Sequence, residues 1–257
     1  MNNIDEQFES LSQCFRIQLE NIVKYAGLVR VSEREAISNI EVSIQSTLNA
    51  FHTIHDAIEK VSNKEIEFYS EPELKLILSV RNMKHHNKEK VKFFNDDKLF
   101  FVDFESIDDP TAKVLVYPIR WVDVIDYIEN TKGREKYPLI RSFLNADEFE
   151  EKAEIQGYSL EKIYINIIPL MLVAAKKIVI LCGGYITPDF KSVEAKYFYK
   201  HFHTMSANQR IKCIFPYDKK EYWNTINKLI EHLQFSSDII LGPDNNPYLT
   251  EIQYKAR

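Results

Sequence analysis

The sequence predicts a mainly α-helical protein with a small antiparallel β insertion and a helical C-terminal half. Three observations point to this fold class. The chain of 257 residues holds only 6 glycines and 9 prolines, which is few for an all-β fold full of tight turns. Apolar residues recur three and four positions apart over long segments, as they do in amphipathic helices. Residues 90–120 depart from this pattern and carry aromatic and β-branched runs that are typical of short strands.

Three helices are predicted in the first region, residues 1–89. The first covers about residues 4–25 and the second residues 32–61. Ser32 and Glu35 form a capping-box pattern at the start of the second helix. The third helix covers residues 71–87, with Pro72 in its first turn, where the missing N–H costs little.

The remaining chain is predicted to form the β insertion, residues 90–120, and a helical C-terminal region, residues 121–257, packed on the same core. Two short strands flank Asn95, and residues 112–119 read as a third strand. The C-terminal helices are expected at residues 122–130, 145–156, 160–181, 188–205 and 219–235. Gly183 and Gly184 are a stop signal for the apolar helix before them.

Charge and cysteine content limit the function classes. The net charge of −5 argues against a protein that binds nucleic acid over its whole surface, so an anionic partner must meet a local patch. Cys14, Cys182 and Cys213 show neither a metal-ligand spacing nor an even disulfide set. The longest apolar run, residues 163–181, is interrupted by Lys176 and Lys177 and reads as a buried helix, not a membrane span. The first residues show no signal-peptide pattern, so we predict a cytoplasmic protein without a membrane partner.

A cluster of basic residues occupies the end of the third predicted helix. On a helical wheel, Arg81 and His85 fall near the middle of an apolar arc, while Asn82 and His86 fall on its polar edge. A guanidinium among apolar residues needs a partner, a wet cavity or a second subunit. Residues 75–92 hold one acid, Glu89, and six cations: Lys75, Arg81, Lys84, Lys88, Lys90 and Lys92. Such a patch suits a phosphodiester.

The segment Arg-Asn-Met-Lys-His-His, residues 81–86, resembles the R-x(4–6)-H motif of the HEPN superfamily in its R-N-x-x-x-H form. The resemblance covers about the first 90 residues, including the two long helices that precede the motif. HEPN domains are helical, and many are metal-independent ribonucleases of bacterial toxin–antitoxin and phage-defence systems. The resemblance implies a HEPN-like helical bundle in which Arg81 and His86 are catalytic. It further implies supporting roles for Asn82 and His85, and RNA contacts for Lys84, Lys88 and Lys90.

The position of the catalytic imidazole stays open between two residues. The spacing of the family motif favours His86, whereas the helical wheel places His85 on the same face as Arg81. An imidazole can act as a general acid or a general base at neutral pH. A forked, permanently charged guanidinium suits the oxygens of a phosphorane.

The function implied by the resemblance is an endoribonuclease that uses the 2′-hydroxyl of RNA as nucleophile. Its products carry a 2′,3′-cyclic phosphate and a 5′-hydroxyl, and neither metal nor cofactor is required. The implied protein is a homodimeric toxin or abortive-infection effector of antiviral defence, controlled by an antitoxin or a phage-derived trigger. The alternative is a non-catalytic HEPN-like module that binds a nucleotide or a protein partner.

Other candidate residues are expected to be structural. His52 and His55 lie three apart in the second predicted helix, but we find no acidic or cysteine partner for a metal site at a suitable spacing. His201 and His203 are equally weak as ligands. Cys182 lacks the flanking pattern of a nucleophile and is expected to be buried. The aromatic run at residues 196–202 is expected to pack in a core and not to stack on bases.

Overall fold

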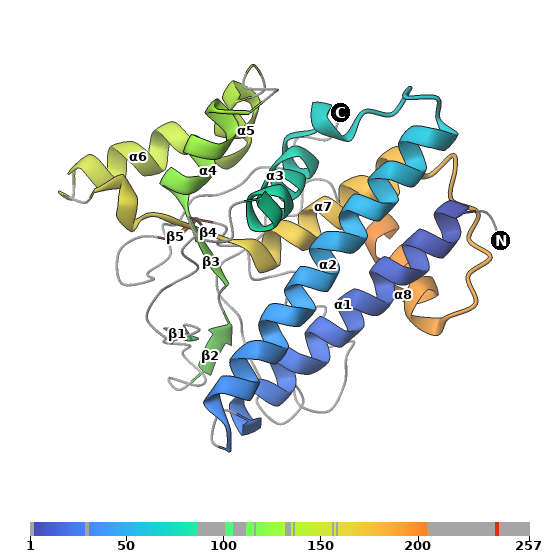
Figure 1. The fold of residues 1–257 in the computed structure, drawn as a ribbon, viewed down its shortest axis with the longest axis horizontal. Helices are drawn as coiled ribbons and strands as arrows, with labels where there is room; N and C mark the ends of the chain where they lie inside the picture. The colour runs from blue at the N-terminus through green and yellow to red at the C-terminus, as the bar shows by residue number, and fades with distance from the viewer. Residues whose placement is uncertain are drawn as a thin grey trace. The chain divides into compact units, whose positions relative to one another are not determined.

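A computed structural model describes residues 3–28, 31–86, 101–104, 112–115, 117–131, 135, 137–155, 157, 159–204 and 240–241. The described part is mainly α-helical, which confirms the predicted class (Figure 1). The chain forms two compact units. One comprises residues 1–81 and 173–206, and the other residues 82–172 and 207–257. Part of the predicted C-terminal region therefore packs with the N-terminal helices.

The first unit is built on two long antiparallel helices, α1 (Asn3–Leu28) and α2 (Glu33–Val61) (Figure 1). Helix α2 begins as predicted, because the Ser32 side chain accepts a hydrogen bond from the Glu35 amide at 3.4 Å. The short 3₁₀ helix η1 (Phe68–Ser70) leads into α3 (Pro72–His86), which starts at the predicted proline. Each of these helices lies within two to three residues of its predicted range.

Aromatic side chains from three helices form the core of this unit. Phe15 of α1 has its ring centroid 6.0 Å from that of Phe51 on α2 and 5.6 Å from that of Phe198 on α8 (Val193–Thr204). These rings are buried, and each contributes about 2–3 kcal/mol through its removal from water. Phe198 and Phe202 of α8 are thus buried, as predicted, whereas Tyr197 is only half-buried.

Two predicted helices of the C-terminal region start later than the sequence suggested. Residues 160–166 form a 3₁₀ turn, η3 (Leu160–Lys162), and a strand, β4 (Tyr164–Asn166), before α7 (Ile167–Cys182) begins. The prediction of one helix over 160–181 was wrong because β4 pairs with β3 (Pro118–Arg120), a nonlocal contact that overrides the local pattern. The end of α7 at Cys182, before the two glycines, is as predicted.

Helix α8 begins at Val193 and not at residue 188, because acidic side chains of α1 hold the preceding segment in another conformation. Asp5 accepts hydrogen bonds from the amide of Thr187, at 2.9 Å, and from its hydroxyl. Glu9 accepts from the amides of Lys191 and Ser192. These bonds anchor the C-terminal part of the first unit on α1.

The second unit contains both described sheets. Strands β1 (Phe101–Phe104) and β2 (Ala112–Leu115) form an antiparallel pair, and β3, β4 and β5 (Ile240–Leu241) form an antiparallel sheet in that order. The predicted strand at 112–119 is therefore two strands in different sheets. The predicted strand before Asn95 and the predicted helix at 219–235 lie outside the described residues.

Three helices accompany these strands: α4 (Trp121–Glu129), α5 (Tyr137–Leu144) and α6 (Ala146–Ile155). Helix α5 was not predicted, because its eight residues are too short to show a clear period. Trp121 is buried, with its indole N–H donating to Glu150 at 2.7 Å. None of the described helices combines the length and the apolar character that crossing a bilayer requires.

Candidate functional site

Helix α3 is buried on almost every side. Of its side chains from Glu73 to Met83, only Arg81 and Asn82 are not buried; both are half-buried. A helix that is enclosed all round belongs to a protein interior. The arginine and asparagine of the predicted motif are therefore the positions at which this stretch of α3 reaches an accessible surface.

Arg81 is oriented by helix α2. Its Nε donates a hydrogen bond to Oδ1 of Asn49, across a distance of 3.4 Å. An amide oxygen fixes the direction of a guanidinium without neutralising its charge, unlike a carboxylate. The guanidinium predicted to bind phosphate thus lies beside Asn49 of α2.

The other residues of the predicted site are described less fully. Residues 84–86 continue α3, so Lys84, His85 and His86 are helical, but their side chains lie outside the described part. Lys88 and Lys90 lie outside the described residues altogether.

Lys75, counted in the predicted basic patch, does not belong to an exposed surface. Its residue is only 4% exposed, and its ammonium lies 5.3 Å from the centre of the Tyr69 ring. The helical wheel did not show this, because it treats one face of α3 as open whereas the folded helix is covered on that face as well. The patch of six cations is thus smaller by at least this residue.

Helix α2 presents a row of polar side chains to this region. Asn49, His52 and Asp56 are three and four residues apart, which places them on one face of the helix. His52 Nδ1 lies 3.1 Å from Asp56 Oδ2, and His55 Nδ1 lies 3.1 Å from Asp56 Oδ1. One carboxylate is therefore shared between two imidazoles, each of which holds one of its oxygens.

His55 is the fixed member of this group. It is 5% exposed, and its ring centre lies 5.3 Å from that of Phe68 and 5.2 Å from that of Tyr69. Its Nε2 is buried without a hydrogen-bond partner, 3.7 Å from a carboxylate oxygen of Glu59. This packing holds the His55 ring, and through its Nδ1 it holds the exposed carboxylate of Asp56.

The environment of His52 favours the neutral form of its ring more than water favours that of a free histidine. Burial of the ring and then the positive charge of Arg81 lower the pKa of His52, while the charge and hydrogen bond of Asp56 oppose them. A neutral ring that donates its Nδ1–H to Asp56 carries its lone pair on Nε2. His52 is thus arranged as a proton acceptor.

The start of α3 is fixed by a separate ionic cluster in the same unit. Lys177 of α7 lies 2.9 Å from a carboxylate oxygen of Glu71 and 3.2 Å from one of Glu73. Burial favours the neutral amine, but the hydrogen bond to Glu71 and the charge of Glu73 prevail and raise the pKa of Lys177. Helix α3 is therefore held by ion pairs at its first turn and by Asn49 near Arg81.

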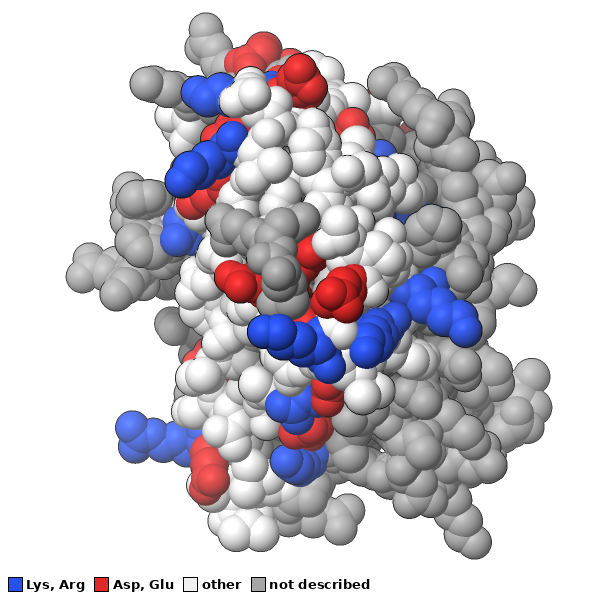
Figure 2. All heavy atoms as spheres, turned by 90° about the vertical axis from the view of Figure 1, so that its right-hand side faces the viewer, with Lys and Arg blue, Asp and Glu red and all other residues white. Residues whose placement is uncertain are grey.

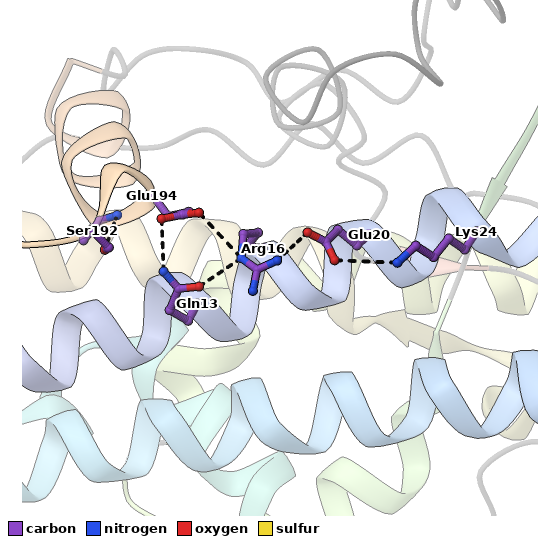
Figure 3. Close-up of polar contacts among 7 residues, drawn as sticks. Gln13, Arg16, Glu20, Lys24, Ser192 and Glu194 are labelled. Atoms are coloured by element: carbon purple, nitrogen blue, oxygen red, sulfur yellow. Dashed lines mark hydrogen bonds and ion pairs between the residues drawn. The ribbon is translucent and has the colours of Figure 1, made fainter.

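Three arginines elsewhere in the described residues form ion pairs with carboxylates. Figure 3 shows Arg16 of α1 between Glu20 and Glu194, with Gln13 and Lys24 extending the chain of polar contacts. Arg141 contacts Asp147 and Glu150, and Arg120 contacts Asp123. On the face shown in Figure 2, described basic side chains also lie next to acidic ones.

Among the described residues, the other candidates from the sequence form no metal-binding or catalytic group. Within the described residues, no group of three or more His, Cys, Asp or Glu side chains is placed to hold a metal. Burial raises the pKa of Cys182 to about 12, so its thiol stays protonated at neutral pH. His201 is part of helix α8.

The group on α2 was not predicted from the sequence. No acidic partner was expected for His52 and His55, but Asp56 is that partner, four residues after His52 and adjacent to His55. This local spacing was a usable signal. The contact between α2 and Arg81 could not be predicted in this way, because Asn49 and Arg81 are 32 residues apart.

The described site thus combines a guanidinium, an imidazole and a carboxylate that orients the imidazole. The first can stabilise negative charge on a phosphate, and the second can accept a proton. Searches with this chain find no matching family model, curated protein or solved structure.

Proposed function

We propose that this chain is a metal-independent endoribonuclease of the HEPN type, acting as a bacterial toxin or anti-phage effector. One observation carries the proposal. Between Glu73 and Met83, Arg81 of the Arg-Asn-x-x-x-His motif is one of two side chains through which α3 reaches an accessible surface, and its charge acts on a neighbouring imidazole. A half-buried guanidinium of this kind is suited to a phosphodiester.

The reaction needs three contributions. The 2′-hydroxyl of the ribose must lose its proton, the 5′-oxygen must gain one, and the additional negative charge on phosphorus must be stabilised. Arg81 supplies the last, through two parallel N–H donors to the phosphorane oxygens. His86 is proposed as the imidazole that protonates the 5′-oxygen, and Asn82 supports it.

We further propose a cytoplasmic homodimer in which two copies of the motif face each other. A two-fold axis through α3 would bring two arginines and two histidines to one RNA strand. Lys84, Lys88 and Lys90 would then bind flanking phosphates, and an antitoxin or a phage-derived trigger would control access. Sedimentation that finds only active monomers would contradict this arrangement.

The proposal is tested by incubating purified protein with total bacterial RNA in EDTA, beside an Arg81→Ala/His86→Ala variant. Wild-type protein is expected to cleave the RNA and to leave 5′-hydroxyl ends, which polynucleotide kinase labels without prior dephosphorylation. Arg34→Ala is the matched control, because Arg34 is an exposed arginine at the start of α2. RNA that survives equally with wild type and double variant contradicts the proposal.

A further inference from the structure

We propose that His52 of α2 is the general base of this ribonuclease, oriented by Asp56 and placed beside Arg81. The inference rests on the proposed function and adds to it a catalytic residue and a positioning residue that lie outside the α3 motif. It assigns the two proton transfers to two different helices. His52 removes the proton of the 2′-hydroxyl, and the motif histidine of α3 protonates the leaving group.

The first support is the orientation of the His52 ring. Asp56 Oδ2 lies 3.1 Å from His52 Nδ1, and Asp56 Oδ1 is held by His55 at the same distance. The side chain of Asp56 is 59% exposed, and a carboxylate so exposed rarely keeps one orientation without such a contact. Held between two rings, it selects the tautomer of His52 with the proton on Nδ1 and the lone pair on Nε2.

The second support is the position of Arg81. Asn49, which accepts the hydrogen bond from Arg81, lies three residues before His52 on the same helix. Side chains three apart on a helix are neighbours, with Cβ atoms about 5–6 Å apart. A phosphate bound by Arg81 therefore lies close to His52, and the ribose attached to that phosphate comes within reach of the ring.

The charged groups around His52 agree with a base that is unprotonated at neutral pH. His55 and Asp56 of α2 and Arg81 of α3 are the charged or titratable groups that act on its ring. Burial and the charge of Arg81 lower the pKa of His52, so the ring is mostly neutral when it meets substrate. Arg81 then has two effects, since it binds the phosphate and keeps the base unprotonated.

The step balances without an outside reactant. The proton of the 2′-hydroxyl moves to Nε2 of His52 while the 2′-oxygen forms a bond to phosphorus. The bond from phosphorus to the 5′-oxygen breaks, and that oxygen takes a proton from the motif imidazolium of α3. Proton exchange with water returns both rings to their starting states.

The first experiment compares cleavage of a mixed-sequence RNA oligomer in EDTA by wild type, Arg81→Ala, His52→Gln and Thr53→Ala. His52→Gln is expected to reduce the rate about 100-fold, as loss of a general base does. Thr53 is exposed and adjacent on α2, so Thr53→Ala is expected to retain the wild-type rate. Melting temperature and sedimentation show that each variant is folded.

Two further readouts separate a base from a residue that only shapes the fold. Imidazole added to the buffer is expected to restore part of the activity of His52→Ala. In Asp56→Asn, the acidic limb of the pH–rate profile is expected to move to lower pH, because Asp56 raises the pKa of His52.

The outcomes distinguish the two proposals. Wild-type protein that leaves the RNA intact overturns the proposed function, and this inference with it. Wild-type cleavage that Arg81→Ala abolishes, with His52→Gln as active as wild type, overturns only the role of His52. A slow His52→Ala that imidazole does not rescue, with an unmoved limb in Asp56→Asn, also overturns that role.

Discussion

Two contacts in the first unit place an arginine between helices, and their surroundings differ. At the contact of α1 with α8, Arg16 meets the carboxylates of Glu20 and Glu194 (Figure 3). At the contact of α2 with α3, Arg81 meets the amide of Asn49 and acts on the imidazole of His52. A carboxylate neutralises a guanidinium, whereas an amide directs it. The first contact is therefore suited to joining helices, and at the second the guanidinium lies where its charge acts on a proton acceptor.

The two carboxylates differ in the same way. Glu194 lies in the first turn of α8, where its charge favours the helix dipole, and it also accepts a hydrogen bond from Gln13 at 3.1 Å. Asp56 instead lies between two imidazoles, and its charge opposes the effect of Arg81 on His52. A carboxylate that holds and tunes an imidazole is an arrangement found in acid–base catalysis.

The strongest test of this comparison exchanges arginine for lysine at both contacts. Arg81→Lys keeps the charge and loses the forked pair of donors, so we expect about a 100-fold loss of RNA cleavage. Arg16→Lys is expected to leave cleavage within about twofold, because Arg16 serves only to join helices. Initial rates on one RNA oligomer measure both. Equal losses in the two variants would mean that the contacts do not differ in role.

A second test concerns the opposite end of α3. Glu73 is 2% exposed and lies 3.2 Å from Lys177. Glu73→Gln removes one of the two carboxylates that neutralise the largely buried ammonium of Lys177. We expect the free energy of unfolding to fall by about 2–3 kcal/mol, measured by urea denaturation. Glu65→Gln, at an exposed position before η1, is the control and should be nearly neutral. A stable Glu73→Gln would show that the ion pairs do not fix α3.

The sequence predicts those structural features that depend on residues close together along the chain. The cap at Ser32 and the stop after Cys182 were predicted, because both depend on residues within one turn. Strand β4 was not, because its pairing with β3 joins segments more than 40 residues apart along the chain. Propensity and period contain no information about such a partner.

In the candidate site, too, the parts within one helix could be predicted from the sequence and the contacts between helices could not. The α3 motif was visible in the sequence, and so in principle was the pair of His52 and Asp56, four residues apart on one helix. Their meeting with Arg81 required the packing of α2 against α3. The burial of Lys75 also required it, because a helical wheel shows faces but not what covers them.

A third test uses the pH dependence of stability at the α2 contact. The pKa of His52 in the folded protein is below its ordinary value of 6.5. Between these two pKa values, His52 is more often protonated in the unfolded chain than in the folded chain. The contribution of His52 to the free energy of unfolding is therefore complete above pH 6.5. It declines as the pH falls toward the pKa of His52 in the folded state. We expect the difference in unfolding free energy between wild type and His52→Gln to shrink over that interval. A difference that grows on acidification would contradict the direction of the shift.

The smallest effect is expected at the α1–α8 contact. Glu194→Gln removes a partly exposed ion pair with Arg16 and a charge near the N-terminus of α8, while Gln13 can still bond the new amide. We expect a loss of about 0.5–1 kcal/mol in unfolding free energy and no change in RNA cleavage. High salt should reduce this loss, because partly exposed charges are screened. If Glu194→Gln instead slows cleavage while the protein stays folded, the carboxylate-paired contact is not merely structural, and the distinction drawn between Arg16 and Arg81 fails.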